Sequence, residues 1–157
     1  NSLQAEINYS PFYQFEIRLA YRWLDVQTQY KNAVLEKPLI ARNRGFLNFA
    51  YSTHTNWKFD FTSQWYGPKR IPSTLMNPAD KQMPSSSPAY MQMNAQISKK
   101  LGKKWELYLG AENLTNYVQE KMIVSAENPF SPYFDASMIW GPINERLIYA
   151  GFRFKIK

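Results

Sequence analysis

The sequence lacks cysteine entirely and contains a single histidine, His54. Disulfide bridges, cysteine-based zinc sites and thiol nucleophiles are therefore excluded, together with most histidine chemistry. Long hydrophobic runs are also missing. The longest, Leu147 to Phe152, has six residues, where a membrane-spanning helix needs roughly 20. The composition therefore excludes a helical membrane protein.

Aromatic side chains, by contrast, are abundant. There are 10 Phe, 11 Tyr and 5 Trp among 157 residues, although the mean hydropathy is only −0.51. Lysine and arginine number 19 against 12 acidic residues, which gives a formal net charge of +7. A chain of this length is one domain with room for a core. Because the chain is polar on average yet rich in aromatic rings, the positions of the rings indicate which class of fold it belongs to.

Apolar and polar side chains alternate with a period of two. Between Phe15 and Trp23 every second residue is apolar, and the residues between them include Glu16, Arg18 and Arg22. This pattern indicates a strand with one apolar face, and no segment has the period of an amphipathic helix. The pattern predicts an all-β fold, an antiparallel up-and-down meander of about seven strands. The predicted strands lie near residues 3–9, 15–23, 47–51, 57–65, 91–97, 105–112 and 148–156.

The predicted connections alternate between short and long. Short ones lie near 10–14, 54–56 and 100–102, whereas the long ones contain most of the proline and span about 29–42, 67–88 and 114–144. Turn residues of this kind mark loops. No stretch has the composition of a domain linker, so we expect residues 1–157 to belong to a single domain.

The apolar row also predicts the register of two hairpins, because a slip of one residue would turn the row to the other face. Tyr51 should lie opposite Phe59, with residues 54–56 as a three-residue loop that ends on a left-handed asparagine. By the same argument Ile97 should lie opposite Trp105, with residues 100–102 as the loop.

Four tryptophans lie on the apolar row, each at the end of its strand: Trp23, Trp57, Trp65 and Trp105. A soluble sandwich has no reason to place indoles at its ends. Amphipathic indoles do form girdles at the two interfaces of an outer-membrane barrel. Trp57 and Trp65 are about 26 Å apart along an extended strand, close to the apolar height of such barrels, about 25 Å. Together with the alternating loops, the tryptophans favour a transmembrane β-barrel.

The last third of the sequence resembles the C-terminal end of TonB-dependent outer-membrane receptors of Bacteroidota-type bacteria. Residues 110–117 (GAENLTNY) resemble the family's ENLTN box, and residues 133–138 and 140–143 also match. The closing segment resembles the signal that the barrel assembly machinery reads. Its matching residues are Tyr149, Gly151, Phe154 and Ile156.

The resemblance implies a segment of a barrel of roughly 22 strands. The family imports scarce ligands such as iron chelates, vitamin B12 or oligosaccharides across the outer membrane, driven by TonB acting on an N-terminal plug. The chain starts almost directly in a predicted strand, without a signal peptide or plug, and seven strands is an odd number. We therefore expect the C-terminal part of a receptor barrel. Its partners would be outer-membrane lipid, the assembly machinery, a small-molecule or glycan ligand, and TonB through the absent plug.

No pair of nucleophile and base and no cluster with metal-ligand spacing is visible, so we expect neither an enzyme nor a cofactor. The four lysines at 99, 100, 103 and 104 fit a barrel rim better than a nucleic-acid site. A soluble antiparallel β-sheet binding module and a small passive barrel are the alternatives. Candidate ligand contacts, which loop packing would also explain, are Trp140, Tyr133, Phe134, Phe130, Arg70 and Lys69.

Overall fold

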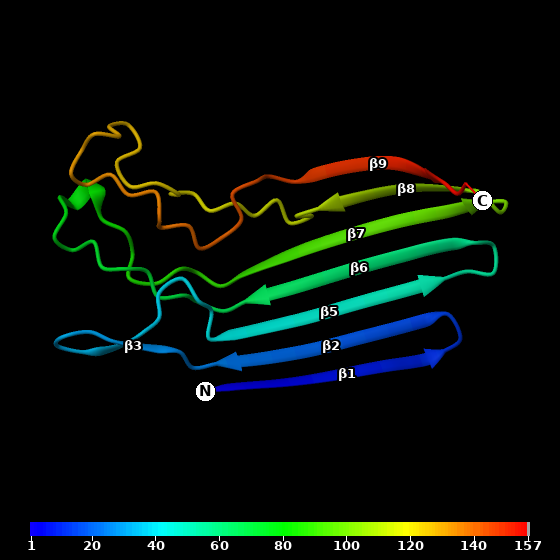
Figure 1. Cartoon of the computed structure of the whole chain (residues 1–157), viewed down its shortest axis with the longest axis horizontal. Coiled ribbons are helices and arrows are strands. Elements are labelled where there is room, and N and C mark those ends of the chain that lie inside the picture. Colours follow the sequence, from blue (N-terminus) through cyan, green and yellow to red (C-terminus); the bar gives the residue numbers. More distant parts are fainter. Residues whose placement is uncertain (157) are drawn as a thin grey trace.

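The computed structural model describes residues 1–156 and is all-β, with one short 3-10 turn, η1 (Ala79–Lys81). Seven strands form one antiparallel sheet in the order β1-β2-β5-β6-β7-β8-β9 (Figure 1), and β3 pairs with β4 in a separate hairpin. The predicted seven-stranded meander is confirmed. The strands are β1 (Ser2–Phe12), β2 (Phe15–Leu24), β3 (Gln27–Gln29), β4 (Val34–Glu36), β5 (Asn43–Ser52), β6 (Trp57–Tyr66), β7 (Tyr90–Leu101), β8 (Trp105–Glu112) and β9 (Leu147–Phe154).

Short turns lie at one end of the sheet and long connections at the other, and we call these the turn end and the loop end (Figure 1). The first predicted turn is shorter than expected, because β1 continues to Phe12 and leaves only Tyr13 and Gln14 between the strands. The predicted loop at 29–42 contains part of the β3–β4 hairpin. Strands of three residues are too short for a period-two pattern to reveal.

One of the two predicted registers is confirmed. Tyr51 lies opposite Phe59, and Asn56 ends the three-residue loop with a φ of 66°. The second register is wrong, because Ile97 lies opposite Leu109 and Trp105 pairs with Leu101 instead. The loop is therefore 102–104, and the alternation continues through Leu101. A shift by an even number of residues keeps every side chain on its face, so the apolar row could not exclude it.

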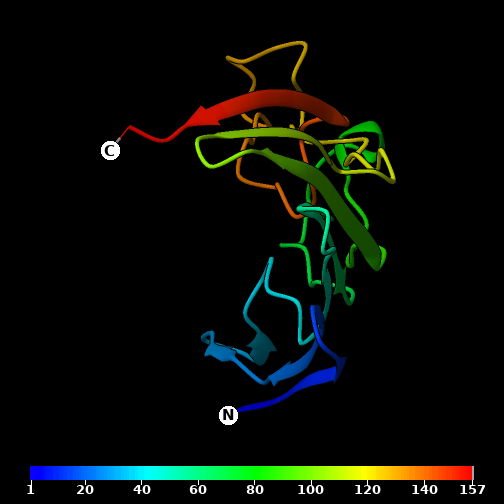
Figure 2. The ribbon, with the colours of Figure 1, turned by 90° about the vertical axis from the view of Figure 1, so that its right-hand side faces the viewer.

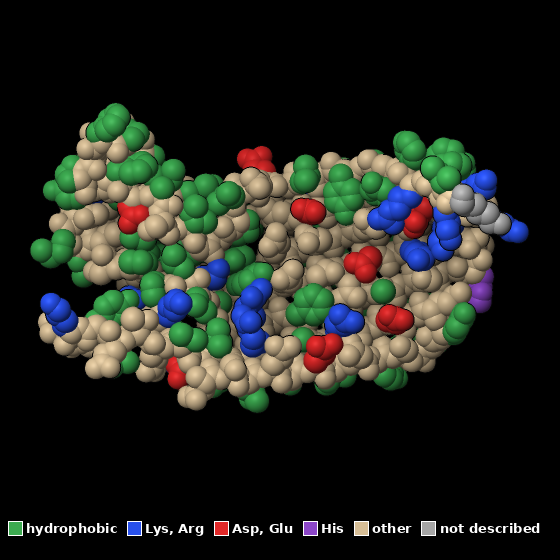
Figure 3. All heavy atoms as spheres, in the orientation of Figure 1, with side chains coloured by type: hydrophobic (Ala, Val, Ile, Leu, Met, Phe, Trp, Pro, Cys, Tyr) green, Lys and Arg blue, Asp and Glu red, His purple; other side chains and the backbone are tan. Residues whose placement is uncertain are grey.

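The apolar rows of all seven strands line up on one face. Leu19, for example, lies between Ile7 of β1 and Leu47 of β5. Seen from the turn end, the sheet is strongly bowed (Figure 2). The face turned to the viewer in Figure 3 is the concave one, where charged side chains lie over the strands. The apolar row is on the convex face, where Trp57 is 38% exposed and Trp105 46% exposed.

The buried core lies in the loops and not on the sheet. Ile71, Met83, Val124 and Met138 form one buried cluster, and Trp140 packs against it. These residues come from the connections β6–β7 and β8–β9, which we call together the loop lobe. The strands β1 and β9 each have a neighbour on one side only. The sheet is therefore open at both edges.

Candidate ligand-binding site

An aromatic stack crosses the concave face at the loop end. The rings of Tyr66 and Tyr90 are stacked with centroids 4.8 Å apart, and the ring of Tyr117 continues the stack at 5.3 Å from Tyr90. Tyr66 and Tyr90 are direct cross-strand neighbours on β6 and β7, which places them on the same face. Trp140 closes the group, with its ring centroid 6.0 Å from Tyr90 and 6.4 Å from Tyr117. The stack joins the sheet to the loop lobe.

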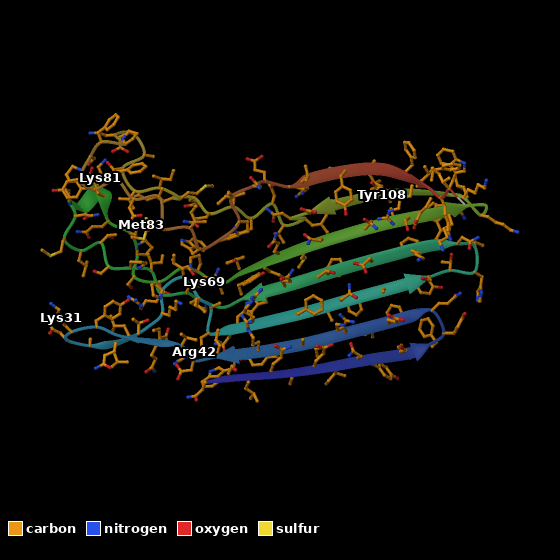
Figure 4. The ribbon with its side chains drawn as sticks, in the orientation of Figure 1. Lys31, Arg42, Lys69, Lys81, Met83 and Tyr108 are labelled. Atoms are coloured by element: carbon orange, nitrogen blue, oxygen red, sulfur yellow. The ribbon has the colours of Figure 1, made fainter. Side chains whose placement is uncertain are left out.

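Lys69 lies in the β6–β7 connection, three residues after the end of β6, and contacts this stack (Figure 4). Its ammonium group donates to the Tyr90 hydroxyl at 3.1 Å and to the carbonyl of Trp140. The nitrogen lies 5.3 Å from the Tyr66 ring centroid and 5.1 Å from that of Tyr90, within the range of cation–π attraction. Burial lowers the pKa of Lys69, and the positive charge of Arg44 lowers it further. The lysine therefore links the β6–β7 and β8–β9 connections, and its side chain is buried.

Beside the stack the loop lobe is hollowed by about 440 Å³. One wall comes from the β6–β7 connection with Met83, Pro84 and Pro88, and the other from Tyr117, Lys121 and Trp140. Burial raises the pKa of the Tyr117 phenol above its ordinary value, and a phenol is neutral at physiological pH even without that shift. Apolar rings with a few polar groups at the edge suit a small ligand that has a flat apolar surface, such as a sugar ring or a planar chelate.

Two buried amides fix the β8–β9 connection that forms this wall. The side chain of Gln119 donates to the carbonyls of Lys121 and Met138 at 2.8 and 2.9 Å. Its oxygen accepts from the amides of Trp140 and Gly141 at 2.8 and 3.0 Å. The side chain of Asn113 donates to the carbonyl oxygens of Tyr117 and Asn144 and accepts from the Tyr117 amide. The predicted loop is thus held in one shape by its own polar groups.

The residues expected to bind ligand are placed in three different surroundings. Trp140 lines the hollow, and Lys69 lies next to it but is covered by the stack. Arg70 lies elsewhere, where it donates to the carbonyl of Glu36 and the hydroxyl of Tyr30 and so anchors the β3–β4 hairpin. Three rings lie further out on the β8–β9 connection, exposed and away from the hollow: Phe130, Tyr133 and Phe134.

Sequence reasoning missed the tyrosines of the stack. Tyr66 and Tyr90 lie at strand ends on the polar row. A large ring among polar neighbours was the feature of the sequence that could have marked them as site residues. Tyr117 closes the segment that resembles the ENLTN box, and its place beside Trp140 depends on the fold of the whole connection.

Two further features concern the described part of the chain, a metal-binding cluster and a membrane-spanning helix. Among residues 1–156 no group of three or more His, Cys, Asp or Glu side chains could hold a metal ion. In the same residues no helix is long and apolar enough to cross a membrane.

No family model matches the chain, and no curated protein matches it.

A second hollow of about 260 Å³ lies on the concave face between β1 and β6. Arg22 and Arg44 are directly opposite each other on neighbouring strands and both line it, together with Arg18. Like charges placed directly opposite repel, which costs stability. Arg44 rests on Tyr66, with its guanidinium carbon 4.5 Å from the ring centroid, and Arg18 lies 3.6 Å from Glu6. The face is therefore strongly polar and suited to water or to another polar body.

The tryptophans and the terminal segment occupy the expected ends of the sheet. Trp23 and Trp65 are at the loop end, and Trp57 and Trp105 at the turn end. In β9, Phe154 lies on the convex face against Trp105, at 4.6 Å between ring centroids. Ile156 follows the strand and is 83% exposed.

The structure gives a packing reason for the glycine in this segment. Gly151 lies opposite Tyr108, and a Cβ atom there would collide with the tyrosine hydroxyl. The arrangement is repeated two pairs away, where the ring of Tyr149 covers Gly110. A ring that lies over a cross-strand glycine fills the space which the missing side chain leaves.

Replacing Gly151 by alanine should lower the free energy of unfolding by about 1 kcal/mol, because Tyr108 must swing aside. With Tyr108→Ala in the same molecule the cost should disappear, so the double variant should lose less than the sum of the single variants. Urea unfolding in detergent micelles measures all three. Strict additivity would show that the tyrosine does not crowd this position.

Proposed function

We propose that this chain is part of the barrel of an outer-membrane active transporter, driven by TonB, that imports a scarce ligand of the iron chelate, vitamin B12 or oligosaccharide class. The observation that carries the proposal is the bowed sheet (Figure 2), whose convex and concave faces differ in polarity. Its convex face is apolar and uncovered, and its concave face is polar and charged. Outer-membrane barrels have this distribution, with lipid outside and a polar lumen inside.

The tryptophans support the proposal further. Trp57 begins β6 and Trp65 is its penultimate residue, on the same face. Eight residues of strand span about 26 Å, close to the apolar band of about 25 Å. The rings at the turn end form a nearly continuous row, in which Phe15 stacks with Phe49 and Trp57 with Phe59. Such belts anchor a barrel at the two interfaces.

The open edges of the sheet and its loop lobe are consistent with a segment of a larger barrel. Further strands of the barrel would pair with β1 and β9, since unpaired strand edges invite pairing. Short turns would face the periplasm and the long loops the outside. The ligand would then meet the hollow beside Trp140 before it enters the polar lumen.

A soluble antiparallel β-sheet binding module is one of the two alternatives that the sequence left open. Such a module would bury its apolar row against a second layer. In residues 1–156 no second layer covers Trp57, Trp65 or Trp105, which are 38%, 36% and 46% exposed. The exposed indoles therefore favour the membrane proposal.

Single-cysteine labelling tests both location and orientation, since the chain itself has no cysteine. In the full-length protein, with any cysteine outside these 157 residues replaced, Ser73→Cys places a thiol on an exposed residue at the loop end, and His54→Cys places one at the turn end. We expect the protein in the outer-membrane fraction. A membrane-impermeant maleimide should label the Ser73→Cys variant in intact cells and label the His54→Cys variant only after the outer membrane is permeabilised.

Equal labelling of both variants in intact cells would contradict the orientation. Recovery of the protein in the soluble fraction would contradict the proposal as a whole and would favour the soluble module.

A further inference from the structure

A hollow on the convex face lies near the turn end and is lined by residues of β6, β7 and β8. It has a volume of about 590 Å³ and an almost wholly apolar lining that includes Trp57, Ile97, Leu101, Leu107 and Leu109. This volume is in the range of small-molecule sites. This hollow, which we call the groove, lies on the face that the proposed function assigns to lipid.

One cation lies within this apolar row. Lys99 occupies the position between Ile97 and Leu101 on β7, and it lines the same groove. Its nitrogen lies 4.8 Å from the Trp57 ring centroid and donates to the carbonyl of Thr55 at 2.6 Å, so the ammonium is directed toward the turn. A lysine whose stem follows apolar surface while its charge reaches the interface is the arrangement called snorkelling.

A second cation lies on the same side. The nitrogen of Lys104 is 6.0 Å from the ring centroid of Phe154, and Phe154 belongs to the convex row. The nearby carboxylate of Glu106 is on the opposite face, 3.4 Å from Arg153. Neither lysine has a carboxylate within salt-bridge distance in residues 1–156. Lys99 in the groove and Lys104 beside it therefore give the convex side of the turn end two positive charges without a neighbouring carboxylate.

We propose that this groove binds an anionic phospholipid, with an acyl chain along Ile97, Leu107 and Leu109 and the phosphate between Lys99 and Lys104. This inference rests on the proposed function, because it requires the convex face to be in a membrane. The apolar lining selects a hydrocarbon chain. The two lysines select net negative charge, since a zwitterionic headgroup already neutralises its own phosphate. Trp57 and Trp105 place the site at the depth of the headgroups.

Brominated lipids test the site, because bromine on an acyl chain quenches a tryptophan that it touches. The full-length protein is reconstituted in phosphatidylcholine vesicles with a minor fraction of phosphatidylglycerol, and either lipid carries the bromine. The part of the quenching that is lost in the Trp57→Phe variant measures lipid bound in the groove. After correction for lipid composition, we expect phosphatidylglycerol to be enriched at Trp57 about fivefold. The enrichment should weaken in salt.

The variant Lys99→Gln with Lys104→Gln should abolish the enrichment and leave quenching by phosphatidylcholine unchanged. The matched control is Lys58→Gln with Lys100→Gln, which removes the same charge at the same end but on the concave face. Equal quenching by the two lipids in the unaltered protein would overturn this site and leave the proposed function standing. Quenching by neither lipid would overturn both.

Discussion

If the chain is part of an outer-membrane barrel, as proposed above, the change Phe154→Asp is expected to reduce the amount of protein in the outer membrane about tenfold or more. Phe154 ends β9 on the convex face and contacts Trp105. It is also one of the four residues that resemble the signal read by the barrel assembly machinery. A carboxylate near the interface of a barrel costs at most about 1 kcal/mol, which predicts only a mild defect. A large loss would therefore come from failed recognition of β9 by the assembly machinery.

Leu101→Asp separates the two explanations. Leu101 and Phe154 lie on either side of Trp105 in neighbouring strands, at the same depth and on the same face. Both are 46% exposed, so the lipid cost of an aspartate should be alike at the two positions. Immunoblots of purified outer membranes measure the outcome. We expect near-normal levels for Leu101→Asp, and normal levels for Phe154→Asp would refute the assembly signal.

The strands could be predicted from the sequence because each is long and has one apolar face. In β2 five alternate positions from Phe15 to Trp23 carry apolar or aromatic side chains, and a period of two over such a length allows no other regular structure. The tight turn at 54–56 could also be predicted, since a polar asparagine had to take the left-handed place there.

The register of the β7–β8 hairpin could not be predicted from the apolar row. Moving the register of the β7–β8 hairpin by four residues changes no side chain's face, so hydrophobicity alone does not choose between Leu109 and Trp105 as the partner of Ile97. The conformation of the β7–β8 turn fixes the register. Gly102 takes a φ of +65° as the first turn residue, not the last, and this extends the ladder to the pair Leu101–Trp105.

The candidate site could be predicted only in part. Lys69 and Trp140 were identified as loop residues with ligand-binding side chains, and the structure brings them into contact across 71 positions of sequence. Tyr66 and Tyr90 were not identified, because rings on a polar row have no periodic pattern of their own. The loop core around Val124 was equally hidden, since a long connection has no repeat from which burial can be inferred.

The β8–β9 connection should lose its shape when Gln119 is replaced by leucine. Gln119 is 1% exposed, and leucine fills nearly the same space without polar atoms. Two carbonyl groups and two amide groups of the backbone would lose their partners, among them the amides of Trp140 and Gly141. A buried polar group without a partner costs about 1–3 kcal/mol. We therefore expect the loop lobe to be destabilised by at least about 2 kcal/mol.

Amide hydrogen exchange measures this loss where it occurs. At about 1.4 kcal/mol for each factor of ten, the amides of Trp140 and Gly141 should exchange roughly thirtyfold faster in Gln119→Leu. The amides of β5 and β6, which depend on the sheet alone, should keep their rates. Gln29→Leu is the control, because Gln29 is exposed in the short strand β3. Unchanged exchange at Trp140 would mean that the apolar cluster, and not the buried amide, holds the wall of the hollow in place.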